Sequence, residues 1–383
     1  MASPLVPNYG AGALSDVVPS IMAGLGVPGV SATVPLPAAR KVCLLLVDGL
    51  GWPQLRAHPK DAPFLNSLAG NEITAGFPAT TATSLTTIGT GVPSGTHGIV
   101  GYSFAASHDE LINALSWGLH GGGRTEDFRE KYVPEEFQPV ETMFQRAADN
   151  GVHVRLATQR VFEGSGLTRA AFRGGEFGGV LALGDLAKSA VEALSAGDRA
   201  FCYAYHSELD LLGHVFGPGS KAWRFQLRQI DRLAETIAEE LPPDGMLVVT
   251  ADHGMVAVGE DDRIDFDVRP ELRDGVRMLG GEPRVRHVYT ESGALGDVQA
   301  AWGAVVGARA WMLTRDEAIA AGWFGPSVAD YARGRIGDLV VATQGNAAVI
   351  RSKVEPRLSL LNGQHGSLTA DDQLIPLLTA TAA

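Results

Sequence analysis

Residues 42–49, VCLLLVDG, decide the fold of this chain, because an unbroken apolar run ends there in an aspartate and a glycine. Such a run, bounded by turn residues, predicts a strand that is buried on both faces of a parallel sheet. Two further runs have the same character, RAFCYAY at Arg199–Tyr205 and MLVVT at Met246–Thr250. Polar residues follow each of them, either at once or after a single alanine. We therefore predict three buried strands of one sheet, with Val42–Val47 as the first.

Helical patterns lie between these runs, at Val140–Asn150, Leu183–Ser195 and Lys221–Leu241. Strands that alternate with helices predict an α/β fold with a mostly parallel central sheet flanked by helices. Ligands of such folds bind at the carboxyl ends of the strands. Asp48 stands at one of these ends, and although a single Asp-Gly is usually a simple turn, three polar strand ends together indicate one shared site.

Residues 256–349 separate the third run from the C-terminal segment, and we predict that they form an inserted, smaller α+β cap. The rest, residues 1–255 and 350–383, is the predicted catalytic core. Within the cap we expect strands at Val285–Tyr289, Ala308–Leu313 and Asp338–Ala342 and helices at Gly296–Val306 and Arg315–Ala321. The region Gly101–Pro139 is rich in glycine and polar residues, which predicts a long active-site loop.

Composition limits the range of partners. The chain has 383 residues, of which 19% are charged, and a formal net charge of −12 argues against binding to a nucleic acid polymer. The two cysteines, Cys43 and Cys202, lie in apolar runs and are expected to be buried free thiols. No apolar stretch is long enough to span a membrane and no signal peptide is visible, so we expect a cytoplasmic protein without a membrane partner. The oligomeric state stays unknown.

A hydroxyl-rich segment, FPATTATSL at residues 77–85, predicts a tight turn that leads into an apolar helix. A hydroxyl at a helix N-terminus meets unpaired backbone N–H groups and the positive end of the dipole, which suits a phosphate group. An ordinary N-cap is the alternative interpretation.

Carboxylates and imidazoles recur at spacings that suit a metal. Asp210 and His214 are four residues apart, so on a helix they share a face and can reach one metal, although a hydrogen-bonded surface pair is the alternative. Asp252 and His253 follow the third strand and can diverge toward different ligands. His365 lies between Gly363 and Gly366, which let the backbone approach a crowded site, although an ordinary loop histidine is the alternative.

The order and local sequence of these motifs resemble the alkaline phosphatase superfamily and, within it, the nucleotide pyrophosphatase/phosphodiesterase family. The resemblance is sharpest at residues 44–51, 77–102, 203–218, 246–255 and 362–366. It implies two divalent metal ions, one held by Asp210, His214 and His365, and the other by Asp48, Thr81, Asp252 and His253.

The same resemblance assigns the nucleophile. Alignment through residues 90–91 and 97–99 places it on Thr81, rather than on Thr80 or Thr83. In the family an asparagine after the glycine of this segment helps to hold a phosphate oxygen. Here Tyr102 follows Gly101, and a tyrosine hydroxyl could serve the same role.

The implied chemistry is hydrolysis of a phosphodiester through a phosphothreonine intermediate. Mixed Asp and His ligands without Cys suit Zn²⁺ or Mn²⁺. A general nucleotide pyrophosphatase or a phosphomonoesterase is the alternative, and a non-catalytic metal-binding relative is a second one. Residues 6–29 and 77–102 look like the cytoplasmic actinobacterial branch of the family, whose members hydrolyse cyclic di-AMP by way of pApA to AMP. The expected partner is therefore a small nucleotide substrate, cyclic di-AMP or pApA.

Overall fold

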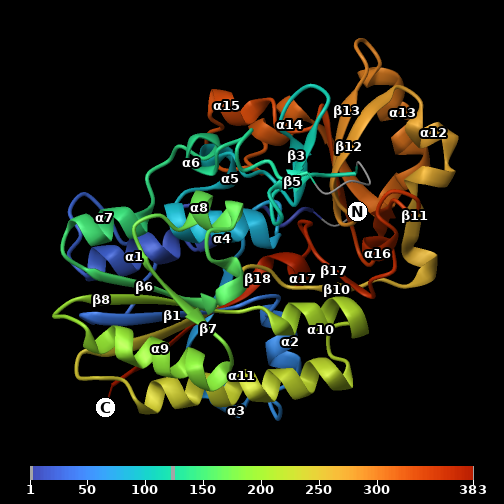
Figure 1. Ribbon diagram of the computed structural model, residues 1–383. Helices are drawn as coiled ribbons and strands as arrows, with labels where there is room; N and C mark the ends of the chain where they lie inside the picture. The colour runs from blue at the N-terminus through green and yellow to red at the C-terminus, as the bar shows by residue number, and fades with distance from the viewer. Residues whose placement is uncertain (1–2, 122–125, 383) are drawn as a thin grey trace.

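The computed structural model describes residues 3–121 and 126–382, and its centre is a seven-stranded sheet in the order β2–β18–β9–β1–β8–β6–β7 (Figure 1). The strands are β1 (Lys41–Val47), β2 (Ala69–Thr74), β6 (His153–Gln159), β7 (Glu176–Val180), β8 (Ala200–His206), β9 (Gly245–Thr250) and β18 (Leu374–Thr381). Five of them pair in parallel, whereas β18 runs antiparallel to both of its neighbours. The predicted α/β fold with a mostly parallel central sheet is confirmed.

The three predicted strands are β1, β8 and β9, each within a residue or two of the predicted bounds. β1 lies between the other two, and Val42–Val47 are buried because helices cover both faces of the sheet. Cys43 and Cys202 face each other in the β1–β8 register and are buried free thiols, as predicted. An unbroken apolar run thus marks a strand at the centre of the sheet.

Helices form a layer on each face of the sheet (Figure 1). One layer contains α1 (Val17–Gly24), α4 (Thr81–Thr90), α7 (Met143–Asp149) and α8 (Gly166–Ala171), and the other contains α2 (Trp52–Ala57), α3 (Pro63–Ser67), α9 (Leu183–Ser195) and α11 (Lys221–Glu239). The helix predicted from Val140 begins only at Met143, because Thr142 caps it by accepting a hydrogen bond from the Gln145 N–H. None of the helices in the described ranges is long and apolar enough to cross a membrane.

Residues 256–349, for which we keep the name cap, contain a second sheet of four antiparallel strands in the order β12–β13–β15–β14. The cap includes β12 (Val276–Glu282), β13 (Val285–Thr290), α13 (Leu295–Val306), β14 (Ala310–Thr314), α14 (Arg315–Ala320) and β15 (Leu339–Thr343). Trp302 and Leu339 belong to a hydrophobic cluster separate from the main core. The first strand, β12, was not predicted, because its two glycines break the apolar pattern.

The prediction that Gly101–Pro139 is one long loop is wrong in part. The region contains a small sheet, β3 (Ser103–Ala105), β4 (Leu111–Asn113) and β5 (Gly118–Leu119), and the short helix α6 (Pro134–Phe137). The small sheet contacts the cap, since the Ser103 hydroxyl donates to the Gly281 carbonyl at 2.8 Å. The part of the predicted loop at residues 122–125 lies outside the described residues.

Candidate metal centre

Polar side chains from four separate segments meet at the carboxyl ends of β1, β8 and β9. Asp48 follows β1 directly, and Asp252 and His253 follow β9 after one residue. The helix α10 (Glu208–Phe216), which follows β8, presents Asp210 and His214. His365 comes from the C-terminal segment, directly after the short strand β17 (Gly363–Gln364). The parallel arrangement explains the convergence, since neighbouring parallel strands end at one edge.

Asp210, His214 and His365 form the first cluster. The Asp210 Oδ2 lies 3.3 Å from the His214 Nε2, as the i,i+4 spacing on α10 predicts. The His365 Nε2 lies 3.3 Å from the His214 Nε2 and 3.9 Å from the Asp210 Oδ1. All three side chains can therefore offer one ligand atom each to the same cation.

Asp48, Asp252 and His253 form the second cluster. The His253 Nε2 lies 3.4 Å from the Asp48 Oδ1 and equally 3.4 Å from the Asp252 Oδ2. Asp210 also lies within reach of this group, between the two clusters. The other oxygen of Asp252, Oδ1, accepts hydrogen bonds at 3.0 Å from the N–H groups of Gly49 and His253, which fixes the carboxylate.

The three histidine rings are oriented by the backbone. His214 Nδ1 lies 2.7 Å from the Gly363 carbonyl, His253 Nδ1 lies 2.8 Å from the Gly254 carbonyl, and His365 Nδ1 lies 2.9 Å from the Ala79 carbonyl. A carbonyl can only accept, so each Nδ1 carries the proton and each Nε2 lone pair of the neutral ring points into the site. Metal-ligating histidines are commonly held in this way.

The carboxylates leave lone pairs unsatisfied in the same space. Asp48 Oδ1, Asp210 Oδ1 and Asp252 Oδ2 are buried and have no hydrogen-bond partner among the described residues. Burial, together with the charges of Asp252 and Asp210, raises the pKa of Asp48 well above its usual value. Burial likewise raises the pKa of Asp252. Buried carboxylate oxygens that lack partners and crowd together in this manner are costly. Divalent cations would remove that cost, so the residues fit two metal ions.

The first cluster holds a proton when no cation is bound. Burial lowers the pKa of His214, but the adjacent Asp210 carboxylate outweighs burial and raises the pKa to about 9. For Asp210, burial raises the pKa, yet His214 and the other histidines lower it overall. His365 has a strongly lowered pKa, because it is buried and faces His253. A cation at this cluster must therefore displace a proton from His214.

Thr81 is the threonine of its segment that faces the clusters. It is the first residue of α4, where backbone N–H groups lack helical partners, and its Oγ1 lies 3.3 Å from the His253 Nε2. The Thr80 hydroxyl instead donates to Glu282, and the Thr83 hydroxyl donates to the Ile99 carbonyl at 3.0 Å. The geometry thus distinguishes Thr81, whose hydroxyl faces the clusters, from Thr80 and Thr83, whose hydroxyls are bonded elsewhere. The residue types alone could not make this distinction.

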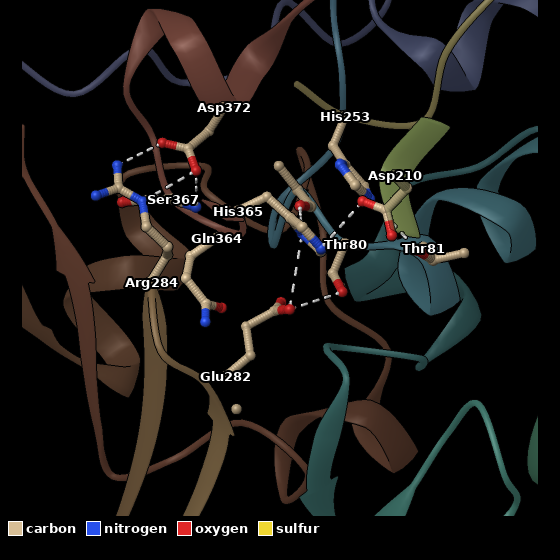
Figure 2. A network of polar contacts seen from close by, with 12 residues as sticks. Thr80, Thr81, Asp210, His253, Glu282, Arg284, Gln364, His365, Ser367 and Asp372 are labelled. Atoms are coloured by element: carbon tan, nitrogen blue, oxygen red, sulfur yellow. Dashed lines mark hydrogen bonds and ion pairs between the residues drawn. The ribbon is translucent and has the colours of Figure 1, made fainter. Parts of the chain in front are cut away.

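The structure shows two supporting residues that the sequence did not reveal. The Tyr205 hydroxyl donates a short hydrogen bond to the Asp48 Oδ2. Glu282, from the cap strand β12, accepts from the Thr80 hydroxyl at 3.1 Å and lies 3.7 Å from the His365 Nδ1 (Figure 2). Burial raises the pKa of Glu282 to about 8. Tyr205 stands five residues before Asp210 at a strand end, a position that could have drawn attention to it. Glu282 carries no comparable signal.

A buried ion pair fastens the cap beside this site. The Arg284 guanidinium donates to the Asp372 carboxylate at 3.2 Å and 2.6 Å, and both side chains are fully buried. Asp372 also accepts from the Ser367 N–H at 3.2 Å, two residues after His365 (Figure 2). The cap is therefore joined to the segment that carries His365.

Tyr102 lies on the cap side of the site, immediately before β3. Its ring packs edge-on against His120, with 5.6 Å between the ring centroids, and burial raises the pKa of its phenol. It is not part of the cavity lining that contains Thr81. The structure thus brings seven predicted site residues together and leaves Tyr102 outside that group.

A cavity of about 280 Å³ opens against the clusters. Asp48, Thr81, Asp210 and His214 are among its lining residues. Most of the other lining residues are aromatic or aliphatic, including Phe162, Phe172, Phe177, Tyr203 and Tyr205. An apolar, aromatic cavity beside a charged centre suits a ligand that joins a flat apolar group to an anion.

The sequence matches the model of a known protein family. The model of the family described as type I phosphodiesterase / nucleotide pyrophosphatase matches residues 42–368, which include every residue of the two clusters. No curated protein matches the sequence.

Solved structures share the fold at low sequence identity. The murine ectonucleotide pyrophosphatase/phosphodiesterase 5 superposes with a TM-score of 0.67 at 17% identity, covering 89% of this chain and 88% of that one. An inactive variant of the murine protein in complex with AMP gives the same values. For the human counterpart, the TM-score is 0.65 at 17% identity, with 89% and 87% covered.

Proposed function

The chain belongs to the type I phosphodiesterase / nucleotide pyrophosphatase family, and from this premise we propose that it hydrolyses nucleotide phosphodiesters with Thr81 as the nucleophile. The observation that carries the proposal is the position of the Thr81 hydroxyl, 3.3 Å from the His253 Nε2 and at the N-terminus of α4. The phosphorus of a diester would bond to the Thr81 Oγ as the leaving alcohol departs. Water then hydrolyses the phosphothreonine, which restores Thr81.

In this proposal Asp210, His214 and His365 hold one divalent metal ion, and Asp48, Asp252, His253 and Thr81 hold a second. The buried carboxylate oxygens that lack hydrogen-bond partners support this assignment. Bound metals would supply positive charge that favours the ionised hydroxyl and the developing charge on phosphate oxygens. Mn²⁺ and Zn²⁺ both suit ligands of these types.

The protein residues would position the substrate. The free N–H groups in the first turn of α4 face the same space as the Thr81 hydroxyl and would donate to phosphate oxygens. The aromatic cavity would take the nucleoside, with its base stacked on side chains such as Tyr205 and Phe162. Tyr102 lies outside the lining of this cavity, so its hydroxyl has no part in this arrangement.

The specific substrate that we propose is cyclic di-AMP, cleaved to pApA and then to AMP in the cytoplasm. The resemblance of residues 6–29 and 77–102 to the actinobacterial branch supports it. One nucleophile suffices for both cuts, because each phosphodiester can be attacked in turn at Thr81. The linear dinucleotide must dissociate or shift before the second cut, so pApA should accumulate transiently.

Chromatography of timed reactions tests this proposal. The protein, loaded with Mn²⁺, is incubated with cyclic di-AMP, cyclic di-GMP or bis-p-nitrophenyl phosphate. We expect pApA to rise and fall before AMP accumulates, with cyclic di-GMP cleaved slowly. If cyclic di-AMP stays intact while bis-p-nitrophenyl phosphate is cleaved rapidly, cyclic di-AMP is refuted as the substrate and the protein is a general phosphodiesterase. A protein that cleaves none of the three would contradict the enzyme activity itself.

A further inference from the structure

Thr80 stands at the N-cap position of α4, but its side chain does not cap the helix. Its backbone is extended, with φ of −141° and ψ of 146°, as is normal for an N-cap residue, yet its hydroxyl accepts no hydrogen bond from the helix. The first hydrogen bond of α4 joins the Ser84 N–H to the Thr80 carbonyl at 2.9 Å. The N–H groups of residues 81–83 therefore have no helical acceptor, and the Thr80 hydroxyl does not supply one.

Glu282 of the cap engages the Thr80 hydroxyl instead. The hydroxyl donates to the Glu282 Oε2 at 3.1 Å, and Figure 2 shows this contact beside Thr81 and His365. Both partners are buried, Thr80 with 2% and Glu282 with 5% of its surface exposed, so little water competes for the bond. A side chain on β12 thus determines where the hydroxyl at the start of α4 lies.

Glu282 is poorly suited to a purely structural role. The two arginines of the β12–β13 hairpin, Arg284 and Arg286, each pair with another carboxylate. The Glu282 Oε1 is buried and has no hydrogen-bond partner in the described part of the chain. The His365 Nδ1 lies 3.7 Å from the Oε2 but donates to the Ala79 carbonyl. A carboxyl group buried for one hydroxyl donor contributes little to holding the cap, because its burial costs more than one hydrogen bond returns.

A glycine makes room for the Glu282 carboxyl group. Gly366 has a φ of +128°, and a Cβ at this position would lie only 2.9 Å from the Glu282 Oε1. The Gly366 carbonyl also accepts from the Ala79 N–H at 3.1 Å, directly before Thr80. The backbone of the C-terminal segment therefore comes close to the turn before α4 while it leaves space for a carboxyl group from the cap.

We propose that Glu282 is a positioning residue, which holds the Thr80 hydroxyl away from the N-terminus of α4 and so keeps the N–H groups there free for a phosphate group. The inference rests on the proposed function, in which these N–H groups donate to phosphate oxygens. Without an acceptor at position 282, the Thr80 hydroxyl would turn to the helix and accept from the N–H of residue 82 or 83, as N-cap threonines commonly do. The phosphate would then lose a donor to the protein itself.

Calorimetric titration of inorganic phosphate onto the Mn²⁺-loaded protein, freed of excess metal, tests the proposal. Glu282→Met removes the acceptor, Glu282→Gln keeps an oxygen that can accept, and Glu271→Met makes the first change at an exposed position of the cap. We expect Glu282→Met to weaken phosphate binding about tenfold, Glu282→Gln much less and Glu271→Met not at all. Adding Thr80→Val to Glu282→Met should restore the affinity to within about twofold, because valine has no oxygen that could cap the helix.

Restoration by Thr80→Val is the decisive result, because a loss of structure or of metal would not be repaired by it. Unchanged phosphate binding in Glu282→Met overturns the proposal, and so does a double variant that binds as weakly as Glu282→Met. If Glu282→Met does not fold, Glu282→Ala replaces it with the same expectations. Hydrolysis of bis-p-nitrophenyl phosphate by the same forms tests the proposed function separately. If none of them cleaves this diester, the proposed function fails, and the phosphate titrations still decide the role of Glu282.

Discussion

Replacing Asp252 by asparagine should stabilise the metal-free protein while it destroys the activity. The Asp252 Oδ1 accepts from the N–H groups of Gly49 and His253, and the amide oxygen of an asparagine can keep both bonds. The amide nitrogen would then replace the Oδ2 that lies 3.4 Å from the His253 Nε2. It would donate to that nitrogen and occupy the lone pair that a metal needs.

The gain in stability follows from the repulsion that the change removes. Asp48 Oδ1 and Asp252 Oδ2 each lie 3.4 Å from the His253 Nε2, so the two oxygens are at most about 7 Å apart. Two negative charges at that separation repel by about 2 kcal/mol at an effective dielectric constant of about 20. The pKa of Asp48 is raised first by burial and then by this repulsion from Asp252. A carboxyl group whose pKa is raised on folding destabilises the folded protein increasingly as the pH rises. The gain in stability from Asp252→Asn should therefore be larger at pH 8 than at pH 5.

Urea unfolding with a chelator present at pH 8 measures this gain, with Asp149→Asn as the control at an exposed aspartate. We expect Asp252→Asn to unfold with a free energy about 2 kcal/mol higher than the unchanged protein. Removing a residue that only supports a metal ligand typically lowers metal affinity or activity by roughly 10–100-fold. Because Asp252 is itself a candidate ligand, Asp252→Asn should lower metal affinity and kcat/KM by more than that. A metal-free Asp252→Asn protein that is less stable than the unchanged one would refute the electrostatic reasoning.

Four further predictions concern the nucleophile, the metals and the cap. In steady-state assays with bis-p-nitrophenyl phosphate, Thr81→Ala should lower kcat by several orders of magnitude and Thr80→Ala much less. If Thr80→Ala were inactive and Thr81→Ala active, the nucleophile would be Thr80 instead. Chelation should abolish activity and Mn²⁺ or Zn²⁺ restore it. The pKa of His214 is raised to about 9, so a metal ion must displace its proton at lower pH. The apparent metal affinity, measured by chelator competition, should therefore rise about tenfold per pH unit between pH 6 and 8. An affinity that does not change with pH would contradict the proton on His214. Arg284→Met should lower the free energy of unfolding by about 3–5 kcal/mol, because it leaves the Asp372 carboxylate buried without its cation; an unchanged urea midpoint would argue against that pair.

The sequence was informative wherever one local pattern determined the outcome. The run at Val42–Val47 needed only its own apolarity to identify a central strand, and the four-residue spacing of Asp210 and His214 needed only the period of a helix. Both follow from contacts between neighbours in the chain. The backbone carbonyls that orient the histidine rings could not be predicted, because the Ala79 carbonyl and His365 are 286 residues apart.

Long-range register explains what the sequence concealed. Tyr205 reaches Asp48 because β1 and β8 pair with Val47 opposite His206, and no local pattern specifies that alignment. Glu282 lies on β12, whose two glycines hid the strand, and it meets Thr80 from 202 residues away. Such supporting residues depend on how separate segments pack, so a single sequence shows the ligands more readily than the residues that hold them.

The last strand of the chain lies inside the sheet, and this affects how the protein can be made. β18 is inserted between β2 and β9, and His365 lies nine residues before Leu374, the first residue of this strand. A nascent chain on the ribosome therefore exposes the edge of β9 until translation reaches Leu374–Thr381, and it lacks one candidate ligand until His365 has left the exit tunnel. A chain cut short by premature termination would have neither a closed sheet nor a complete metal centre. The sheet and the metal centre are consequently complete only after residues 374–381 have been released from the ribosome.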